Sequence, residues 1–188
     1  VALRAHEAAW NARKTLDAGF TTVRNLGSDD GVTLGLRDAI ARGWAVGPRI
    51  IDAGTSISST TGHMDPTLGV REDFHEVLRA SGSTCDGADD CRRAVRRQIA
   101  RGVDVIKIAT TGGVNSRIGL GLGAQMFEDE VRAVVETAHL YGRKVAVHAH
   151  GADGIILALR AGAGSIEHGT LLDHEGVRLL RQTNAYYV

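Results

Sequence analysis

Residues of types that can bind metal ions lie within or at the ends of three consecutive apolar segments of the sequence. Lys107 lies within "DVIKIATTGG", His148 and His150 end "KVAVHAHG", and Glu167 and His168 fall in "SIEHGT". Imidazoles on neighbouring parallel strands can converge on one ion, because such strands lie about 4.8 Å apart and zinc binds histidine nitrogen at about 2.0–2.1 Å. One histidine at a strand end is as often a hydrogen-bonded structural residue. A lysine and two histidines at three consecutive strand ends together indicate a metal centre.

Strand periodicity predicts which way these side chains face. Successive side chains of a strand alternate between its two faces, so Ile106 and Ile108 share one face and Lys107 takes the other. If the isoleucines pack against outer helices, Lys107 points inward, where a lysine must be paired, desolvated or chemically altered. The simpler alternative is that Lys107 extends to the end of its strand. By the same alternation His148 and His150 share a face, and His148 is the deeper of the two.

The elements that carry these residues alternate between helix and strand. Helix-like segments end in glycine, which caps helices at little conformational cost, and β-branched runs begin a few residues later. Nearly continuous apolar strands separated by crossover helices predict an α/β fold with a parallel sheet. Strands are expected near 21–26, 49–53, 104–110, 144–149 and 165–169, with one more beginning at 185–188, and helices over 4–16, 89–100, 128–140, 154–161 and 174–182.

Two architectures fit this alternation, a doubly wound sheet and a (β/α)8 TIM-type barrel. A nucleotide-binding doubly wound sheet is disfavoured, because the glycine-rich stretch "GLGLGAQ" follows a polar loop instead of a strand. Polar residues at the carboxyl ends of strands are typical of barrel enzymes. We therefore predict a barrel that is incomplete in this chain, since about six strands are visible where eight are needed.

Two loops are expected to contact a substrate. His63 lies in "TTGHMD", on a glycine-containing loop after the strand near 49–53, and "TTGGVNS" directly follows the lysine strand. Glycines let a backbone approach a ligand, so Gly113, Asn115 and Ser116 are candidate substrate contacts. Arg117, the next residue, could bind a substrate carboxylate. That His63 is an exposed loop histidine and Arg117 an ordinary loop arginine are the alternatives.

The composition is that of a soluble globular protein. The 188 residues are 43% hydrophobic and 23% charged, with a formal net charge of zero. These values argue against disorder and against nucleic acid or a membrane surface as partner. No signal-peptide pattern is present, and a cytoplasmic and an exported protein both remain open. Cys85 and Cys91 could close a small disulfide loop or remain free thiols.

Four stretches, "VIKIATTGGV", "VAVHAHG", "IEHGT" and "STTGHMDPT", resemble the prolidase-type branch of the metal-dependent amidohydrolase superfamily. The resemblance spans essentially the whole chain. It implies an enzyme that cleaves amide C–N bonds in Xaa-Pro or Xaa-Arg dipeptides or in N-acyl amino acids, through a metal-bridging hydroxide. It further implies two divalent metal ions, with zinc favoured, bridged by a carboxylated Lys107. His148 and His168 would bind the second metal, and His150 would support the site or face the substrate.

The sequence also departs from that family pattern. The superfamily has a His-x-His pair on its first strand and an aspartate at the end of its eighth, and neither is found in the corresponding place here. We expect residues 1–188 to be a partial catalytic barrel, about strands 2–7 of a full-length enzyme, that lacks the first-strand and eighth-strand segments. Alone, it should be weakly active or inactive as a hydrolase. Alternatives are an imidazolonepropionase-like cyclic amidohydrolase and a non-catalytic metal-binding fragment. Homo-oligomerisation is left open.

Overall fold

A computed structural model of the chain describes residues 1–28, 31–116 and 121–188. Among these residues, no helix is long and apolar enough to cross a bilayer. The strands are β1 (Thr22–Asn25), β2 (Arg49–Asp52), β3 (Val105–Ala109), β4 (Lys144–Ala149), β5 (Ser165–His168) and β6 (Tyr186–Tyr187). The helices are α1 (Ala2–Asp17), α2 (Val32–Ala41), the 3-10 helix η1 (Glu72–Phe74), α3 (His75–Arg79), α4 (Ala88–Ala100), α5 (Glu128–Leu140), α6 (Ala152–Ala161) and α7 (His174–Thr183).

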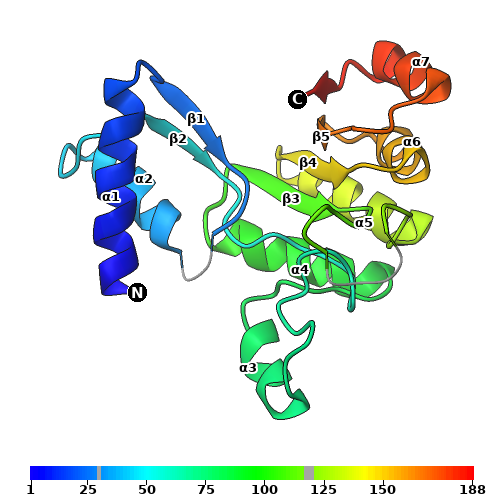
Figure 1. Cartoon of the computed structure of the whole chain (residues 1–188), viewed down its shortest axis with the longest axis horizontal. Helices are drawn as coiled ribbons and strands as arrows, with labels where there is room; N and C mark the ends of the chain where they lie inside the picture. Colours follow the sequence, from blue (N-terminus) through cyan, green and yellow to red (C-terminus); the bar gives the residue numbers. More distant parts are fainter. Residues whose placement is uncertain (29–30, 117–120) are drawn as a thin grey trace.

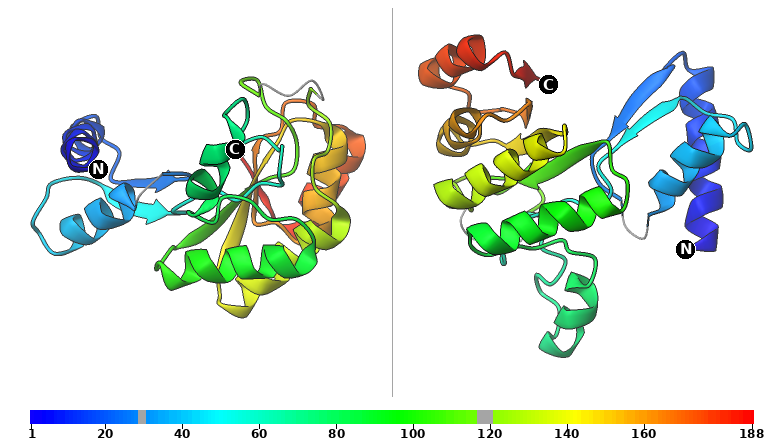
Figure 2. Two further views of the ribbon diagram at one scale, coloured as in Figure 1. Left: turned by 90° about the horizontal axis from the view of Figure 1, so that it is seen from below. Right: turned by 180° about the vertical axis from the view of Figure 1, so that it is seen from behind.

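Neighbouring strands pair in parallel throughout the described chain. β1 pairs with β2, and β3, β4, β5 and β6 pair in that order. The segment after β2 runs beside β3, because Ile57 and Ile108 form a parallel bridge. The strands therefore make one curved wall with α4, α5, α6 and α7 along its outer side (Figures 1 and 2). Within the described residues β1 and β6 do not pair, so the fold is a partial TIM barrel, as predicted.

The two faces of this wall bury different kinds of side chain. Ile106, Ile108, Val145 and Val147 are fully buried in the outer core, which the helices cover. Lys107 lies between the two isoleucines in β3 and therefore faces inward. The inner face carries smaller apolar side chains, among them Ala53, Val105 and Ala146. The alternation predicted for β3 and β4 is thus confirmed.

Helix α2 was not predicted as an element of its own. Its sequence, "VTLGLRDAIA", contains a β-branched threonine and a central glycine, which weaken the helical pattern. The helix is stabilised by packing instead, because Leu36 joins Ala12 of α1 and Ile50 of β2 in a separate apolar cluster. Together α1 and α2 cover the outer face of the β1–β2 pair.

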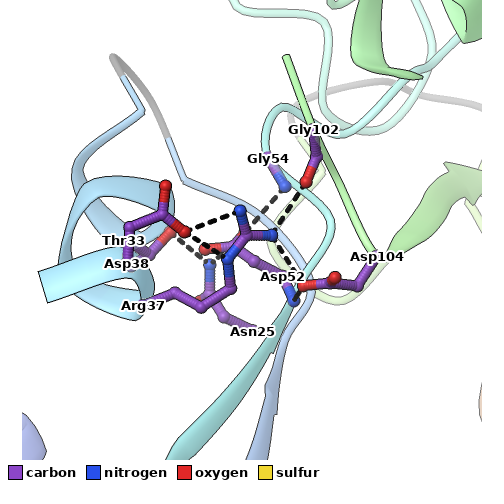
Figure 3. A network of polar contacts seen from close by, with 8 residues as sticks. All are labelled: Asn25, Thr33, Arg37, Asp38, Asp52, Gly54, Gly102 and Asp104. Atoms are coloured by element: carbon purple, nitrogen blue, oxygen red, sulfur yellow. Dashed lines mark hydrogen bonds and ion pairs between the residues drawn. The ribbon is translucent and has the colours of Figure 1, made fainter. Parts of the chain in front are cut away.

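A polar network links α2 and β2 to the start of β3 (Figure 3). The Arg37 guanidinium donates to Asp104 Oδ2 and to the Gly102 carbonyl, both at 2.8 Å. Asp104 in turn accepts the Asp52 backbone N–H at 3.1 Å. Asp52 is fully buried and accepts bonds from the Gly54 N–H at 2.7 Å and the Asn25 amide at 3.3 Å. The network fixes the two-stranded sheet against the four-stranded one.

Cys85 and Cys91, whose pairing the sequence left open, form a disulfide. Both residues are fully buried and their Cα atoms lie 4.8 Å apart. The Cys85 N–H donates to the Ser58 carbonyl at 2.8 Å. The Asp86 carboxylate accepts bonds from the backbone and hydroxyl of Thr60. The disulfide therefore lies beneath the loop that presents His63.

Candidate metal centre

Three imidazoles converge at the carboxyl ends of β4 and β5. His148 belongs to β4, His150 follows it directly, and His168 ends β5. One ligand nitrogen from each lies within 4.8 Å of those of the other two. The His148 ring is 4.8 Å from both the His150 and the His168 ring, and His150 stacks on His168 at 5.0 Å, measured between centroids. Three imidazoles at this spacing are a donor set that suits a divalent transition metal.

Lys107 enters the same side of the wall from β3. Its register partner on β4 is Ala146, so His148 lies two residues further along the neighbouring strand, on the same face. The lysine side chain is buried, and Nζ donates to the Ile108 carbonyl at 3.3 Å. Burial lowers the pKa of Lys107 to about 7. The negative charge of Glu167 acts to raise this pKa, and the positive charge of Arg24 acts to lower it. The amine therefore has a substantial uncharged population near neutral pH.

Hydrogen bonding fixes which nitrogen of His148 is free. Its Nε2 lies 3.1 Å from the Gly112 carbonyl, which can only accept, so Nε2 carries the proton. Nδ1 then keeps its lone pair for a metal ion. Burial lowers the pKa of His148 to about 3; the Gly112 bond opposes this, and the charges of Lys107, His63 and His168 add to it. His148 is accordingly neutral at physiological pH.

His63 joins this centre from the loop after β2. Its ring stacks on that of His148 with 4.1 Å between centroids, and its backbone N–H donates to Gln125 Oε1 at 2.7 Å. Ser116 Oγ accepts the Gly113 N–H at 2.8 Å, so its own hydrogen can point to His63 Nδ1, 2.7 Å away. Where Ser116 donates to Nδ1, the His63 proton is on Nε2. Burial lowers the pKa of His63, and the charges of Lys107, His150 and His168 add to this effect.

Three of the predicted substrate contacts line one cavity, and His150 does not line it. The cavity has a volume of about 260 Å³, and Asn115 and Ser116 line it together with His63. Gly113 is buried against the His63 and His148 rings, so it packs the site instead of facing open space. Arg117, the fourth loop residue predicted to bind substrate, lies outside the described residues. The remaining lining residues are Met64, Asp65 and Leu68.

Sequence reasoning missed two polar contacts at the site. Arg24 of β1 forms two parallel bonds with the Glu167 carboxylate, each 3.0 Å long. His150 Nδ1 lies 2.7 Å from Thr170 Oγ1, which orients that ring. A charged residue inside the apolar segment "TTVRNLG" was the signal for the first contact. The second depends on how the chain turns after β5, which residue types do not reveal.

Comparison of the whole chain with known proteins identifies its family. Residues 5–188 match the Amidohydrolase family. Ochratoxinase of Aspergillus niger is 34% identical over 99% of this chain, and its crystal structure superposes with a TM-score of 0.88. A Xaa-Pro dipeptidase, crystallised with methionine in its active site, is 42% identical over 98% of this chain, with a TM-score of 0.90.

These relatives are longer than the present chain. It covers 42% of the ochratoxinase sequence and 45% of the dipeptidase. A prolidase crystallised with N-methylphosphonate-L-proline is 34% identical over 98% of this chain, which covers 46% of that structure, with a TM-score of 0.85. The family match extends over nearly every residue described above, including the strands that carry Lys107, His148 and His168. The chain therefore belongs to the amidohydrolase family.

Proposed function

We propose that the protein hydrolyses an amide bond next to an amino acid, in dipeptides or N-acyl amino acids, at a centre holding two divalent metal ions. The observation that carries this proposal is the convergence of Lys107 with three imidazoles on the inner side of three neighbouring parallel strands. Barrel enzymes carry their chemistry at the carboxyl ends of such strands. Zinc is the proposed metal, because imidazole ligands suit zinc among other transition metals.

The donor set of the site fits the proposed ions. His148, through Nδ1, and His168 would hold one ion, with His150 beside them as a further ligand or a substrate contact. When bound, the two ions would polarise the substrate carbonyl and lower the pKa of water in the site. The tautomer of His148 follows from its bond to Gly112, and contacts of this kind around a ligand raise metal affinity.

Lys107 is proposed to serve as a bridging ligand after carboxylation. The lone pair of its unprotonated Nζ adds to the carbon of CO2, a C–N bond forms, and one proton leaves to solvent. The product is a carbamate with one negative charge, whose two oxygens suit divalent cations. Within the described residues no carboxylate forms an ion pair with Lys107 itself, so the amine is not held as an ammonium by a direct partner.

The loop residues are proposed to orient the substrate. His63 presents Nε2–H, which can donate to a carbonyl or carboxylate oxygen, beside the cavity that Asn115 and Ser116 line. Hydrolysis adds the oxygen of one water to the amide carbon, breaks the C–N bond and leaves a carboxylate and an amine. The names of the matched relatives, a Xaa-Pro dipeptidase, a prolidase and an ochratoxinase, support an amide substrate.

Hydrolysis of defined substrates tests this function. The complete natural protein that contains this sequence would be incubated with zinc and Met-Pro, N-acetyl-L-methionine or a cyclic imide. The products, free methionine from the first two substrates and the ring-opened acid from the third, would be measured by liquid chromatography with mass spectrometry. We expect the first two substrates to be cleaved, cleavage to stop after treatment with 1,10-phenanthroline, and His168→Ala to be inactive. The matched control is His139→Ala, on the exposed end of α5, which should keep full activity. Absence of free methionine from both the dipeptide and the N-acyl amino acid would contradict the proposal.

A further inference from the structure

Glu167, the residue before His168, forms an ion pair with a residue of β1, a strand that is not its neighbour in the sheet. The Arg24 guanidinium of β1 donates to both carboxylate oxygens at 3.0 Å, and the Ser165 hydroxyl donates to Oε1 at 2.5 Å. The Glu167 side chain is 7% exposed and that of Arg24 is 33% exposed. In the described residues β1 pairs with β2 and β5 with β4 and β6. The ion pair therefore joins two strands that share no backbone hydrogen bonds.

Strand geometry alone would not bring His168 into the metal centre. In the β4–β5 register, His148 lies opposite Glu167, and Ala149 lies opposite His168. Register partners on parallel strands share a face, so Glu167 faces inward with His148. A regular strand would then place His168 on the face of Ala149, which is fully buried in the outer core. Instead, the His168 ring contacts the inward rings of His148 and His150.

A left-handed backbone at His168 accounts for this reversal. Its φ is +76°, a region that residues with a Cβ rarely adopt. Such a conformation persists only where the surroundings enforce it, and it is concentrated at functional sites. It turns the chain at the end of β5, so that the side chains of two consecutive residues, Glu167 and His168, both lie on the inner side of the wall.

The surroundings enforce the turn from both directions. After it, the Gly169 N–H donates to the Ala149 carbonyl at 3.0 Å, and the His168 N–H donates to the Val188 carbonyl at 2.9 Å. Gly169 has a φ of +54°, and the Tyr187 ring packs where a Cβ would stand. Before the turn, the paired carboxylate of Glu167 is the side chain that anchors the backbone. Backbone hydrogen bonds therefore fix His168 and Gly169, and the ion pair with Arg24 fixes Glu167.

We propose that Arg24 is a positioning residue for the metal centre. Through its two bonds to Glu167 it fixes the left-handed turn at His168 and so sets the position of the His168 imidazole relative to those of His148 and His150. This inference rests on the proposed metal centre. Arginine suits the role because its planar guanidinium binds both oxygens of a carboxylate in one orientation, which a lysine ammonium cannot do.

The test measures Co²⁺ affinity and histidine spectra in the complete natural protein. Arg24→Met should weaken Co²⁺ binding roughly 10- to 100-fold, the usual effect of removing a residue that orients a ligand. Glu167→Gln should act in the same direction, and Arg24→Lys should fall between Arg24→Met and the unmodified protein. In metal-free protein, ¹H–¹⁵N spectra of the imidazoles should show the His168 signals moving in Arg24→Met.

Arg37→Met is the matched control. Arg37 also forms an ion pair that joins separate elements, with Asp104 at 2.8 Å (Figure 3). In the described part of the chain, the hydrogen-bond and ion-pair partners of these two side chains include no histidine. Loss of that pair should lower stability and leave Co²⁺ affinity unchanged within about twofold, as expected for independent sites. A purely structural role for Arg24 would make the two arginine variants behave alike.

The outcomes separate this inference from the proposed function. Unmodified protein that takes up no Co²⁺ overturns the metal centre, and the metal-free imidazole spectra still decide whether Arg24 places His168. Unchanged Co²⁺ affinity and unchanged His168 signals in Arg24→Met overturn the positioning role. If Arg24→Met does not fold, as judged by circular dichroism, Glu167→Gln and Arg24→Lys decide the question by the same two measurements.

Discussion

Gly113 is the position where the smallest added group should do the most damage to the site. A Cβ at Gly113 would lie 2.5 Å from His63 Cε1 and 2.9 Å from His148 Cε1. Ordinary van der Waals contact begins at 3.4 Å, so a methyl group needs about 0.5 Å more room from His148 and about 0.9 Å from His63. The two rings stack on each other at 4.1 Å and cannot both yield freely.

The expected size of the effect follows from these overlaps. Inserting a methyl group into a packed site costs about 1–3 kcal/mol of stability, because the surrounding side chains leave their rotamers. Misplacement of a catalytic group by about 1 Å lowers rates by about 10²-fold. His148 and His63 would move by half to nearly all of that distance. We therefore expect Gly113→Ala to reduce kcat/KM by roughly 10- to 100-fold.

Gly35→Ala provides the matched control. Gly35 lies inside α2, has no neighbour within 4 Å of an added Cβ and has no positive φ. Alanine in a helix interior stabilises by about 0.5–1 kcal/mol relative to glycine. Urea denaturation and the kinetics of methionine release from N-acetyl-L-methionine, measured on both variants, make the comparison. Gly113→Ala protein with the stability and kcat/KM of the unmodified protein would refute the close packing of the two rings around this glycine.

Three further predictions concern the loop, the disulfide and the metal. Asp65→Asn should lower the free energy of unfolding by about 1–3 kcal/mol at pH 7, because the buried carboxylate accepts bonds from Thr61 and Thr67. Burial opposes ionisation of Asp65, but those bonds and the Arg79 charge hold the pKa of Asp65 below its ordinary value. The stabilisation by this carboxylate is therefore complete above a pH of about 4 and declines as the pH falls further. Urea titrations of the unmodified and Asp65→Asn proteins should converge in acid. Replacing Cys91 by alanine should cost about 2 kcal/mol by the same measurement, and equal stability with and without the disulfide would refute this. His168→Ala should lower bound zinc in elemental analysis, and full metal content would exclude it as a ligand.

Local periodicity was sufficient to predict the inner and outer faces of the wall. Alternation in "DVIKIATTGG" and "KVAVHAHG" predicted that Lys107 and His148 face inward, and the burial of Ile106 and Ile108 in the outer core confirms the pattern. The strand bounds agreed to within two residues, because glycine marks the helix ends and β-branched runs mark the strands. The partial parallel barrel followed from the same signals.

Features that depend on long-range contact or on a single backbone torsion could not be predicted. His168 was predicted as a metal ligand from its strand-end position and from the family resemblance, but alternation alone would have placed it on the outer face; the φ of +76° that brings it to the centre was not predictable. The pairing of Arg24 with Glu167 joins residues 143 positions apart, a contact that no local pattern encodes. The disulfide between Cys85 and Cys91 was compatible with the spacing but not required by it. Helix α2 was obscured by its central glycine, since packing and not propensity stabilises it.

Metal content tests most directly whether Lys107 and the three histidines form a binuclear centre. The complete natural protein and its Lys107→Ala variant would be prepared with bicarbonate and zinc, dialysed, and analysed by inductively coupled plasma mass spectrometry. We expect about two zinc ions per chain in the unmodified protein and fewer in the variant. Unmodified protein without bound metal, or a variant that retains both ions, would contradict this expectation.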